Sequence, residues 1–207
     1  MTLRARAHGL EFTGVPGQFN AITDVPSVEV GYTTLIRGDD VRTGVTAILP
    51  RGRDGVFLPC AAGWYSLNGN GEMTGTTFLT ETGALSLPVL VTNTHAVGTC
   101  HRGIIDWLVG AFPDLPDDWA LPVVAETWDG YLNDINRAHL TTADAMRPSR
   151  PRRAGRSPRA VSAAAPAWSA TASRVVTAPL HAVWVTARTR TRWVLSCRRT
   201  SGRAGNS

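Results

Sequence analysis

Short runs of apolar and β-branched residues alternate with glycine, proline and asparagine from residue 20 to residue 126. This alternation is typical of strands joined by tight turns. The last two runs are almost wholly apolar, as expected for strands that are covered on both faces. We expect strands at residues 28–36, 45–49, 56–59, 64–67, 87–92 and 121–125.

One helix is expected directly after Asn93, because the apolar positions that follow lie close to helical spacing. Pro113 then ends the helix, since proline lacks the backbone N–H that a helix interior requires. The apolar positions are Val97, Ile104, Ile105, Leu108 and Val109.

A second helix is expected near Thr141 or Thr142, where a side-chain hydroxyl can serve as the N-cap. It has no plausible continuation, because Pro148 and Pro151 follow within a run of arginines. Strands mixed with helices in this order predict an α/β sandwich for residues 1–146.

The charge changes sign abruptly near residue 146. All 16 acidic residues lie at or before Asp144, and with eight arginines they give residues 1–146 a net charge of −8. Residues 147–207 hold the other 13 of the 21 arginines and no acidic residue, and they also lack Ile, Phe, Tyr and Gln. The pI near 9.8 would suggest a nucleic-acid partner, but the average misleads because the segment with a folding pattern is acidic. We therefore expect two parts, 1–146 and 147–207.

Three features favour a soluble protein of a reducing cytoplasm. Cys60, Cys100 and Cys197 are too few and too unevenly spaced for a disulfide framework. The charges that follow Met1 precede no apolar segment typical of a signal peptide. No apolar run approaches the roughly 20 residues of a membrane helix.

Four segments carry the functional signal, and residues 42–50 link the first two. The segments are Asn20-Ala-Ile-Thr-Asp-Val-Pro-Ser-Val-Glu-Val-Gly31, Ser66-Leu-Asn-Gly-Asn-Gly-Glu-Met-Thr-Gly75, Thr92-Asn-Thr-His-Ala-Val-Gly98 and Ala125-Glu-Thr-Trp-Asp-Gly-Tyr-Leu-Asn-Asp-Ile-Asn136. In this order and spacing they resemble the D-aminopeptidase/L-esterase (DmpA) family, which includes the β-peptidyl aminopeptidases. The resemblance covers about residues 4–146, with Trp128 where many members have Tyr and Tyr32 where many have His.

The resemblance implies a serine hydrolase with a four-layer α/β/β/α sandwich, of the kind found in N-terminal-nucleophile hydrolases, usually assembled into homo-oligomers. The precursor cuts itself at a Gly–Ser bond, and the freed serine attacks substrate while its α-amino group moves protons. Substrates are small peptides, amides or esters with a free amino end, D- and β-amino acid peptides included. No cofactor is implied.

Four residues match the family's site, and three of them also have a structural interpretation. Tyr131 corresponds to the tyrosine that donates to the oxyanion, or is an aromatic at the core edge. Glu126 corresponds to the carboxylate that holds the substrate's amino terminus, or is a solvated strand-end acid. Asn93 caps the following helix, lines the pocket, or does both. Asn133 is expected to contact substrate.

Metal and nucleotide sites are not favoured. His95, Cys100 and His101 lack a carboxylate at a familiar spacing, and a helix points the last two apart. The glycines of residues 69–75 do not have nucleotide-loop spacing, and no P-loop lysine is present.

The arginine-rich segment has two competing explanations. Taken literally, 147–207 resembles a disordered nucleic-acid-binding arm with Trp168, Trp184 and Trp193 as stacking platforms. Alternatively the segment is read in a shifted frame of GC-rich DNA. Read from the third base of each codon, residues 157–160 permit Val-Ala-Glu-Gly and residues 163–168 permit Gly-Gly-Gly-Thr-Gly-Met. Residues 195–202 permit Val-Val-Val-Gln-Ala-Asn-Phe-Gly.

All three strings are similar to what the family carries downstream, in one frame and in family order, so we favour a frameshift near residues 140–150. The family's second oxyanion donor, an asparagine, is then replaced by Thr200 or its neighbours. The Gly–Ser bond lies beyond Ser207, so the nucleophile is absent and we expect no activity. We also expect 147–207 to be disordered or falsely helical. A self-processing acetyltransferase is a third possibility, against which residues 20–31 and 125–136 argue.

Overall fold

The computed structural model describes residue 9, residues 14–66, 69–114 and 119–147, and the backbone of two strands at 181–186 and 192–194. The strands are β1 (Glu29–Arg37), β2 (Val41–Leu49), β3 (Cys60–Ser66), β4 (Ala84–Leu85), β5 (Val89–Asn93), β6 (Val123–Thr127), β7 (His181–Thr186) and β8 (Arg192–Val194). The helices are α1 (Thr76–Thr82), α2 (Val97–Ala111) and α3 (Thr142–Ala145), with 3-10 turns η2 (Ile22–Asp24) and η3 (Thr94–Ala96).

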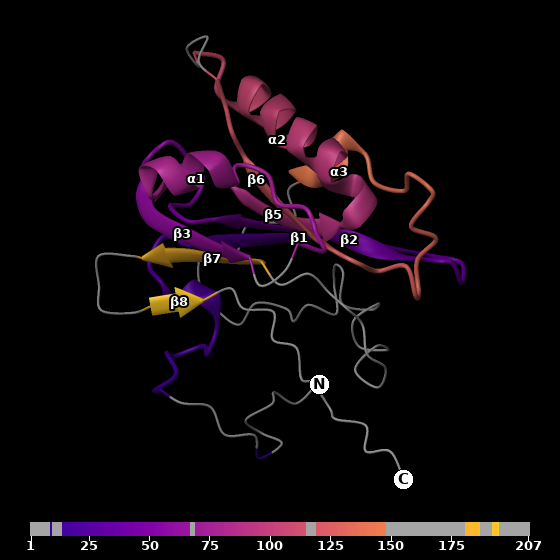
Figure 1. Cartoon of the computed structure of the whole chain (residues 1–207), viewed down its shortest axis with the longest axis horizontal. Helices are drawn as coiled ribbons and strands as arrows, with labels where there is room; N and C mark the ends of the chain where they lie inside the picture. Colours follow the sequence, from indigo (N-terminus) through magenta and orange to yellow (C-terminus); the bar gives the residue numbers. More distant parts are fainter. Residues whose placement is uncertain are drawn as a thin grey trace.

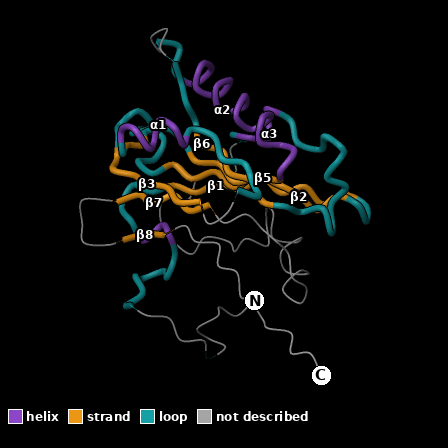
Figure 2. Tube along the Cα trace, in the orientation of Figure 1, coloured by secondary structure: helices purple, strands orange, loops and turns teal. Residues whose placement is uncertain are grey.

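These elements form three layers (Figure 1). One sheet has the strand order β1-β2-β5-β6, and the other has the order β4-β3-β7-β8. Helices α2 and α3 lie over one face of the first sheet, and the second sheet lies against the other face, as the tube view also shows (Figure 2). Helix α1 packs against β3 and β4 of the second sheet. The described residues therefore form three of the four expected α/β/β/α layers.

Two apolar cores hold the layers together. Leu90 of β5 and Val124 of β6 are fully buried against Ile104 and Leu108 of α2, in the core between helices and sheet. The second core lies between the sheets, with Val30, Ile48, Val89 and Val123 on one side and Cys60 and Leu85 on the other. Strands β5 and β6 thus supply both cores, which explains why their sequences are almost wholly apolar.

In the first sheet the central strand β5 and the edge strand β6 are neighbours. Strands β1 and β2 form an antiparallel hairpin, and β5 adds antiparallel to β2. Strand β6 runs parallel to β5. A parallel pair needs a long crossover, which η3 and α2 provide. The carboxyl ends of β5 and β6 therefore lie side by side.

Most of the expected elements are confirmed. Strands lie at 29–37, 41–49, 60–66, 89–93 and 123–127, and the long helix follows Asn93 and ends at Ala111, before Pro113. The short second helix begins at Thr142, and Asp144 accepts from both N–H and hydroxyl of Thr141 at 3.0 and 2.7 Å. The hydroxyl at this terminus thus donates to a carboxylate.

The strand expected at residues 56–59 is wrong. That segment is a turn, in which the N–H of Leu58 donates to the carbonyl of Gly55 at 2.9 Å. Val56 is 3% exposed in the core next to the helices, so its burial comes from the packing of a turn. Helix α1 was not expected, because its sequence holds four threonines, which are poor helix formers. Left-handed glycines flank it, Gly75 with φ +72° and Gly83 with φ +62°.

The arginine-rich part differs from expectation at nine residues. Residues 181–186 pair antiparallel with β3, and 192–194 pair with 181–186, so neither segment is helical or disordered. The rest of 148–207 and its tryptophan side chains lie outside the described residues, as does Cys197.

Candidate functional site

The candidate site is built where β5 and β6 end. In their parallel register Thr92 pairs with Glu126 and Asn93 pairs with Thr127. The carboxyl ends of adjacent parallel strands are where open α/β sheets place ligand-binding side chains. Two of the expected site residues, Asn93 and Glu126, therefore reach the same edge of the sheet.

Glu126 has a buried carboxylate with a specific partner. The residue is 9% exposed, and the Thr94 hydroxyl donates to its Oε2. Burial raises the pKa of Glu126, and the charge of Glu72 raises it further, while the Thr94 hydrogen bond and His95 act in the opposite direction. A carboxylate of this kind gains from the arrival of a cation, because the cation offsets the cost of burying negative charge.

Three of the four sequence segments meet around Glu126. The backbone of Glu72, from the second segment, accepts from the N–H of Glu126 at 3.1 Å. Thr94, from the third, contacts the carboxylate itself. The ring Nδ1 of His95 lies 3.0 Å from the carbonyl of Ile135, in the fourth.

Asn93 is confirmed as the cap of the turn that starts the helix. Its Oδ1 accepts from the N–H of Ala96 at 2.9 Å, and its Nδ2 donates to the Thr43 hydroxyl of β2 at 2.9 Å. Asn93 is 5% exposed, so the side chain is committed to the protein, and its contact with substrate stays a prediction.

Asn133 is buried and bonded to an acid. It is 4% exposed, and its Nδ2 donates to Oδ1 of Asp129 at 3.1 Å. Asp129 is fully buried, and burial raises its pKa, while Thr43, Asn133 and the charge of His139 lower it. Sequence reasoning missed Asp129, although an acid two residues beyond an apolar strand is a recognisable signal. A substrate contact by Asn133 also stays a prediction.

Tyr131 lies on the outer side of the turn that Asp129 organises. It is 61% exposed, whereas the N–H groups of the next two residues, Leu132 and Asn133, both donate to the carbonyl of Asp129. Trp128, two residues from Glu126, is 39% exposed. The structure thus brings Glu126 and Asn93 together inside the fold and leaves Tyr131 on the surface.

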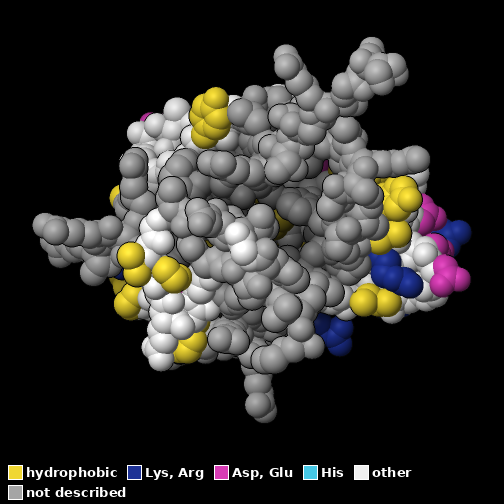
Figure 3. All heavy atoms as spheres, turned by 90° about the horizontal axis from the view of Figure 1, so that it is seen from below, with side chains coloured by type: hydrophobic (Ala, Val, Ile, Leu, Met, Phe, Trp, Pro, Cys, Tyr) yellow, Lys and Arg dark blue, Asp and Glu magenta, His cyan; other side chains and the backbone are white. Residues whose placement is uncertain are grey.

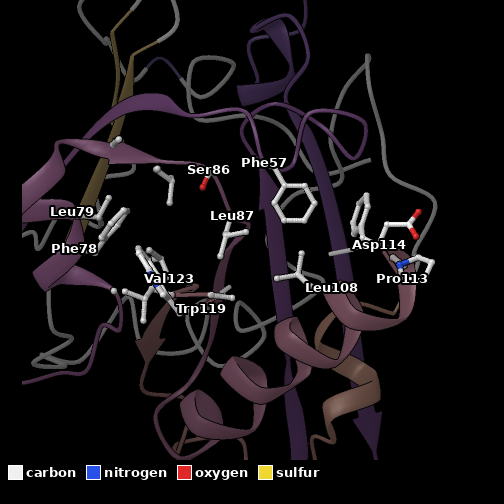
Figure 4. Close-up of a pocket in the computed structure, with 17 residues that line it drawn as sticks. Phe57, Phe78, Leu79, Ser86, Leu87, Leu108, Pro113, Asp114, Trp119 and Val123 are labelled. Atoms are coloured by element: carbon white, nitrogen blue, oxygen red, sulfur yellow. The ribbon is translucent and has the colours of Figure 1, made fainter. Parts of the chain in front are cut away.

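A cavity of about 770 Å³ lies elsewhere (Figure 4). It is lined by apolar side chains such as Phe57, Phe78, Leu87 and Trp119, with Asp114 at its margin. Leu87 precedes β5 and Val123 starts β6, so the cavity is at the amino ends of the strands, opposite to Glu126. It does not include the convergent polar groups.

Within the described ranges, no three His, Cys, Asp or Glu side chains gather in a way that could hold a metal ion. In the same part of the chain no helix has the length and apolar character to cross a membrane. Seen from the side of the second sheet (Figure 3), most of the visible basic and acidic side chains of the described residues lie toward one end, so that end carries charges of both signs.

Comparison with known proteins places this arrangement in a family. The model of peptidase family S58 matches residues 20–168. The chain belongs to this family. The match starts later than the expected residue 4, and it crosses residue 146 into the arginine-rich segment.

Relatives of known name support the assignment. The chain is 49% identical over 152 residues to β-peptidyl aminopeptidase BapA of Sphingosinicella microcystinivorans, covering 70% of this chain and 38% of that relative. It therefore spans well under half the length of this curated family member.

Solved structures agree on the fold. A Burkholderia sp. β-aminopeptidase superposes with a TM-score of 0.68 at 42% identity, over 75% of this chain and 45% of that one. The L-aminopeptidase D-Ala-esterase/amidase of Ochrobactrum anthropi, described as a prototype for the serine aminopeptidases and a variant of the Ntn hydrolase fold, gives 0.64 at 46% identity, over 69% and 42%. The S58 fold is thus the Ntn hydrolase type, and a nucleic-acid-binding function gains no support from these relatives.

Proposed function

We propose that the intact gene product is an N-terminal-serine aminopeptidase that releases amino-terminal residues from small peptides, amides or esters, with β- and D-amino acid peptides among its substrates. The observation that carries the proposal is the buried carboxylate of Glu126 at the meeting point of three family segments. A substrate ammonium group would pair with this carboxylate through charge-assisted hydrogen bonds. An acyl group with no amino end would leave the carboxylate unpaired.

In this proposal the remaining site residues act around the reacting carbonyl. Tyr131 donates to the oxyanion of the tetrahedral intermediate, and Asn93 and Asn133 form the polar floor of the substrate site. We also propose that the enzyme works as a cytoplasmic homo-oligomer, as the family resemblance and the cysteine usage suggest.

We further propose that residues after about 146 are read in a shifted frame, so that this chain is inactive as written. The 207 residues contain no Gly–Ser dipeptide, and self-cleavage at such a bond creates the family's nucleophile. The three collinear family-like strings in the alternative frame support the same conclusion.

The test is to resequence the coding DNA from codon 135 to several hundred bases beyond codon 207, and to express the chain as written beside a version with the frame restored. We expect the chain as written to keep one intact mass and release nothing from a β-alanyl amide. The restored protein should split at a Gly–Ser bond and release the amine. If the restored protein splits but hydrolyses only amides without a free amino end, the proposed role of Glu126 is wrong.

A further inference from the structure

Two buried oxygen atoms in the turn beyond β6 lack hydrogen-bond partners. They are Oδ2 of Asp129 and Oδ1 of Asn133, and no described group donates to either. Their side chains already share one hydrogen bond, from Nδ2 of Asn133 to Oδ1 of Asp129 at 3.1 Å. A buried acceptor left unpaired is destabilising, so two in one side-chain pair need an explanation.

One proton satisfies both atoms. We propose that Asp129 is held as the neutral carboxylic acid and that its Oδ2–H donates to Oδ1 of Asn133, closing a two-bond acid–amide pair. The carboxylic acid then offers one donor and one acceptor, which match the acceptor and donor of the amide. Turning the amide of Asn133 over does not solve the problem, because it would set its oxygen against a carboxylate oxygen.

The surroundings of the pair favour the neutral acid. Asp129 is fully buried, and Thr43 of β2 and Asn133, whose hydrogen bonds to its carboxyl act against burial and lower its pKa, carry no charge. The charged group that acts on Asp129 is His139, and its effect is smaller than that of burial. Desolvation raises the pKa of Asp129, in the direction that retains the proton.

The pair positions a loop. Asn93 donates to Thr43, Thr43 acts on Asp129, and Asp129 holds Asn133, so one buried polar chain links the ends of β2, β5 and β6. The loop that it fixes, 128–136, carries Tyr131, and its Ile135 carbonyl lies 3.0 Å from Nδ1 of His95, the neighbour of Thr94. Asp129 is therefore a positioning residue. The acid–amide pair itself does not depend on the proposed function, whereas its role in positioning Tyr131 for catalysis rests on that function.

The first test is the full chain with Asp129→Asn, because an asparagine supplies the same donor and acceptor without a titratable proton. At neutral pH we expect its urea midpoint to equal or exceed that of the wild type, and Asp129→Ala to lower the midpoint. Amide exchange of residues 128–136 should accelerate in Asp129→Ala and return to the wild-type rate in Asp129→Asn.

The second test is spectroscopic and does not require Asp129→Ala to fold. The infrared difference between wild type and Asp129→Asn at neutral pH should contain the C=O band of a protonated carboxyl group. A carboxylate band in its place, together with a lower urea midpoint for Asp129→Asn, would overturn the proposal. Retention of the acid band without any change in loop exchange would keep the pair and reject the positioning role. Neither outcome depends on peptidase activity, so failure here and failure of the proposed function are separate.

Discussion

Glu72 lies directly opposite Glu126 in the antiparallel contact that covers the outer edge of β6. The carbonyl of Glu72 accepts from the N–H of Glu126 at 3.1 Å, and Met73 bridges Ala125 beside them. Like charges in facing positions are unfavourable, and an exposed β-edge needs cover. The segment thus protects the edge and at the same time sets a second carboxylate beside the buried one.

The first prediction concerns the pKa of Glu126. Because Glu72 contributes to raising that pKa, Glu72→Gln should lower it toward its ordinary value of 4.5. Carboxyl NMR titration of the two proteins, assigned with Glu126→Gln, measures the change. An unchanged Glu126 titration in Glu72→Gln would show that the two side chains point apart.

The same raised pKa fixes the sign of a stability change with pH. The folded protein retains the Glu126 proton to higher pH than the unfolded chain, so this contribution is present below pH 4.5 and is lost as pH rises through the folded-state value. Urea unfolding of Glu126→Gln should therefore lose this part of the fall in stability with rising pH. A steeper fall in the variant would contradict the sign.

The second prediction concerns Asn93. Asn93→Ala removes the acceptor for the Ala96 N–H and the donor to Thr43, and loss of such a cap costs about 0.5–2 kcal/mol. Asn136→Ala is the matched control. Because Asn136 is exposed, its substitution should change stability by less than about 0.5 kcal/mol. Equal urea midpoints for the two variants would show that the cap contributes little.

The strands were predictable because their signal is local. The run at residues 28–36 holds five β-branched residues, which favour strands, and residues 87–92 and 121–125 are apolar because both cores use them. The segment at 56–59 misled because Val56 is buried by the packing of a turn, which no local pattern records. Helix α1 was missed because its threonines have a low helix propensity. Tertiary contacts, such as those of the buried Leu79, outweigh that low propensity.

The third prediction tests how closely α2 and α3 pack. A Cβ at Gly103 would lie 2.5 Å from the Cβ of Ala145 and 2.5 Å from the carbonyl oxygen of Thr142. Gly103→Ala should therefore destabilise by roughly 1–3 kcal/mol through overpacking. Gly110→Ala, on the same helix with nothing within 4 Å of its Cβ position, should stabilise by up to about 1 kcal/mol. Thermal unfolding decides between them, and a neutral Gly103→Ala would mean that α3 can move away.

The fourth prediction uses the cysteines as reporters of folding. Cys100 is fully buried, and burial raises its pKa to about 11; Cys60 is also buried with a raised pKa. Since the thiolate is the reactive form, neither should be alkylated by iodoacetamide in the folded protein at mildly alkaline pH. Both should react in urea, and peptide mass spectrometry reads each site separately. Rapid labelling of Cys100 without denaturant would show that α2 is not packed on the sheet.

The site was only partly predictable, because its contacts join residues that are far apart in sequence. Glu126 and Asn93 were found from their segments, and the cap made by Asn93 follows from its place after a strand. The proximity of Glu72 depends on how the edge of β6 is covered. The hydrogen bond between Asp129 and Thr43 of β2 joins residues that lie 86 positions apart in the chain. The local sequence pattern predicts neither of these contacts.

The last prediction separates two candidate oxyanion donors in the frame-restored enzyme. Tyr131 is the donor by resemblance, yet it is 61% exposed, and Trp128 stands where many family members have Tyr. An indole N–H is also a hydrogen-bond donor. If Tyr131 is the donor, Tyr131→Phe should lower kcat by about 100- to 1,000-fold and leave folding and the urea midpoint unchanged. Trp128→Phe should alter kcat by much less. The reverse result would assign the oxyanion to Trp128 and leave Tyr131 as a surface aromatic. Tyr131→Phe removes only the hydroxyl, so a loss of kcat in that variant reports the missing donor and not missing bulk.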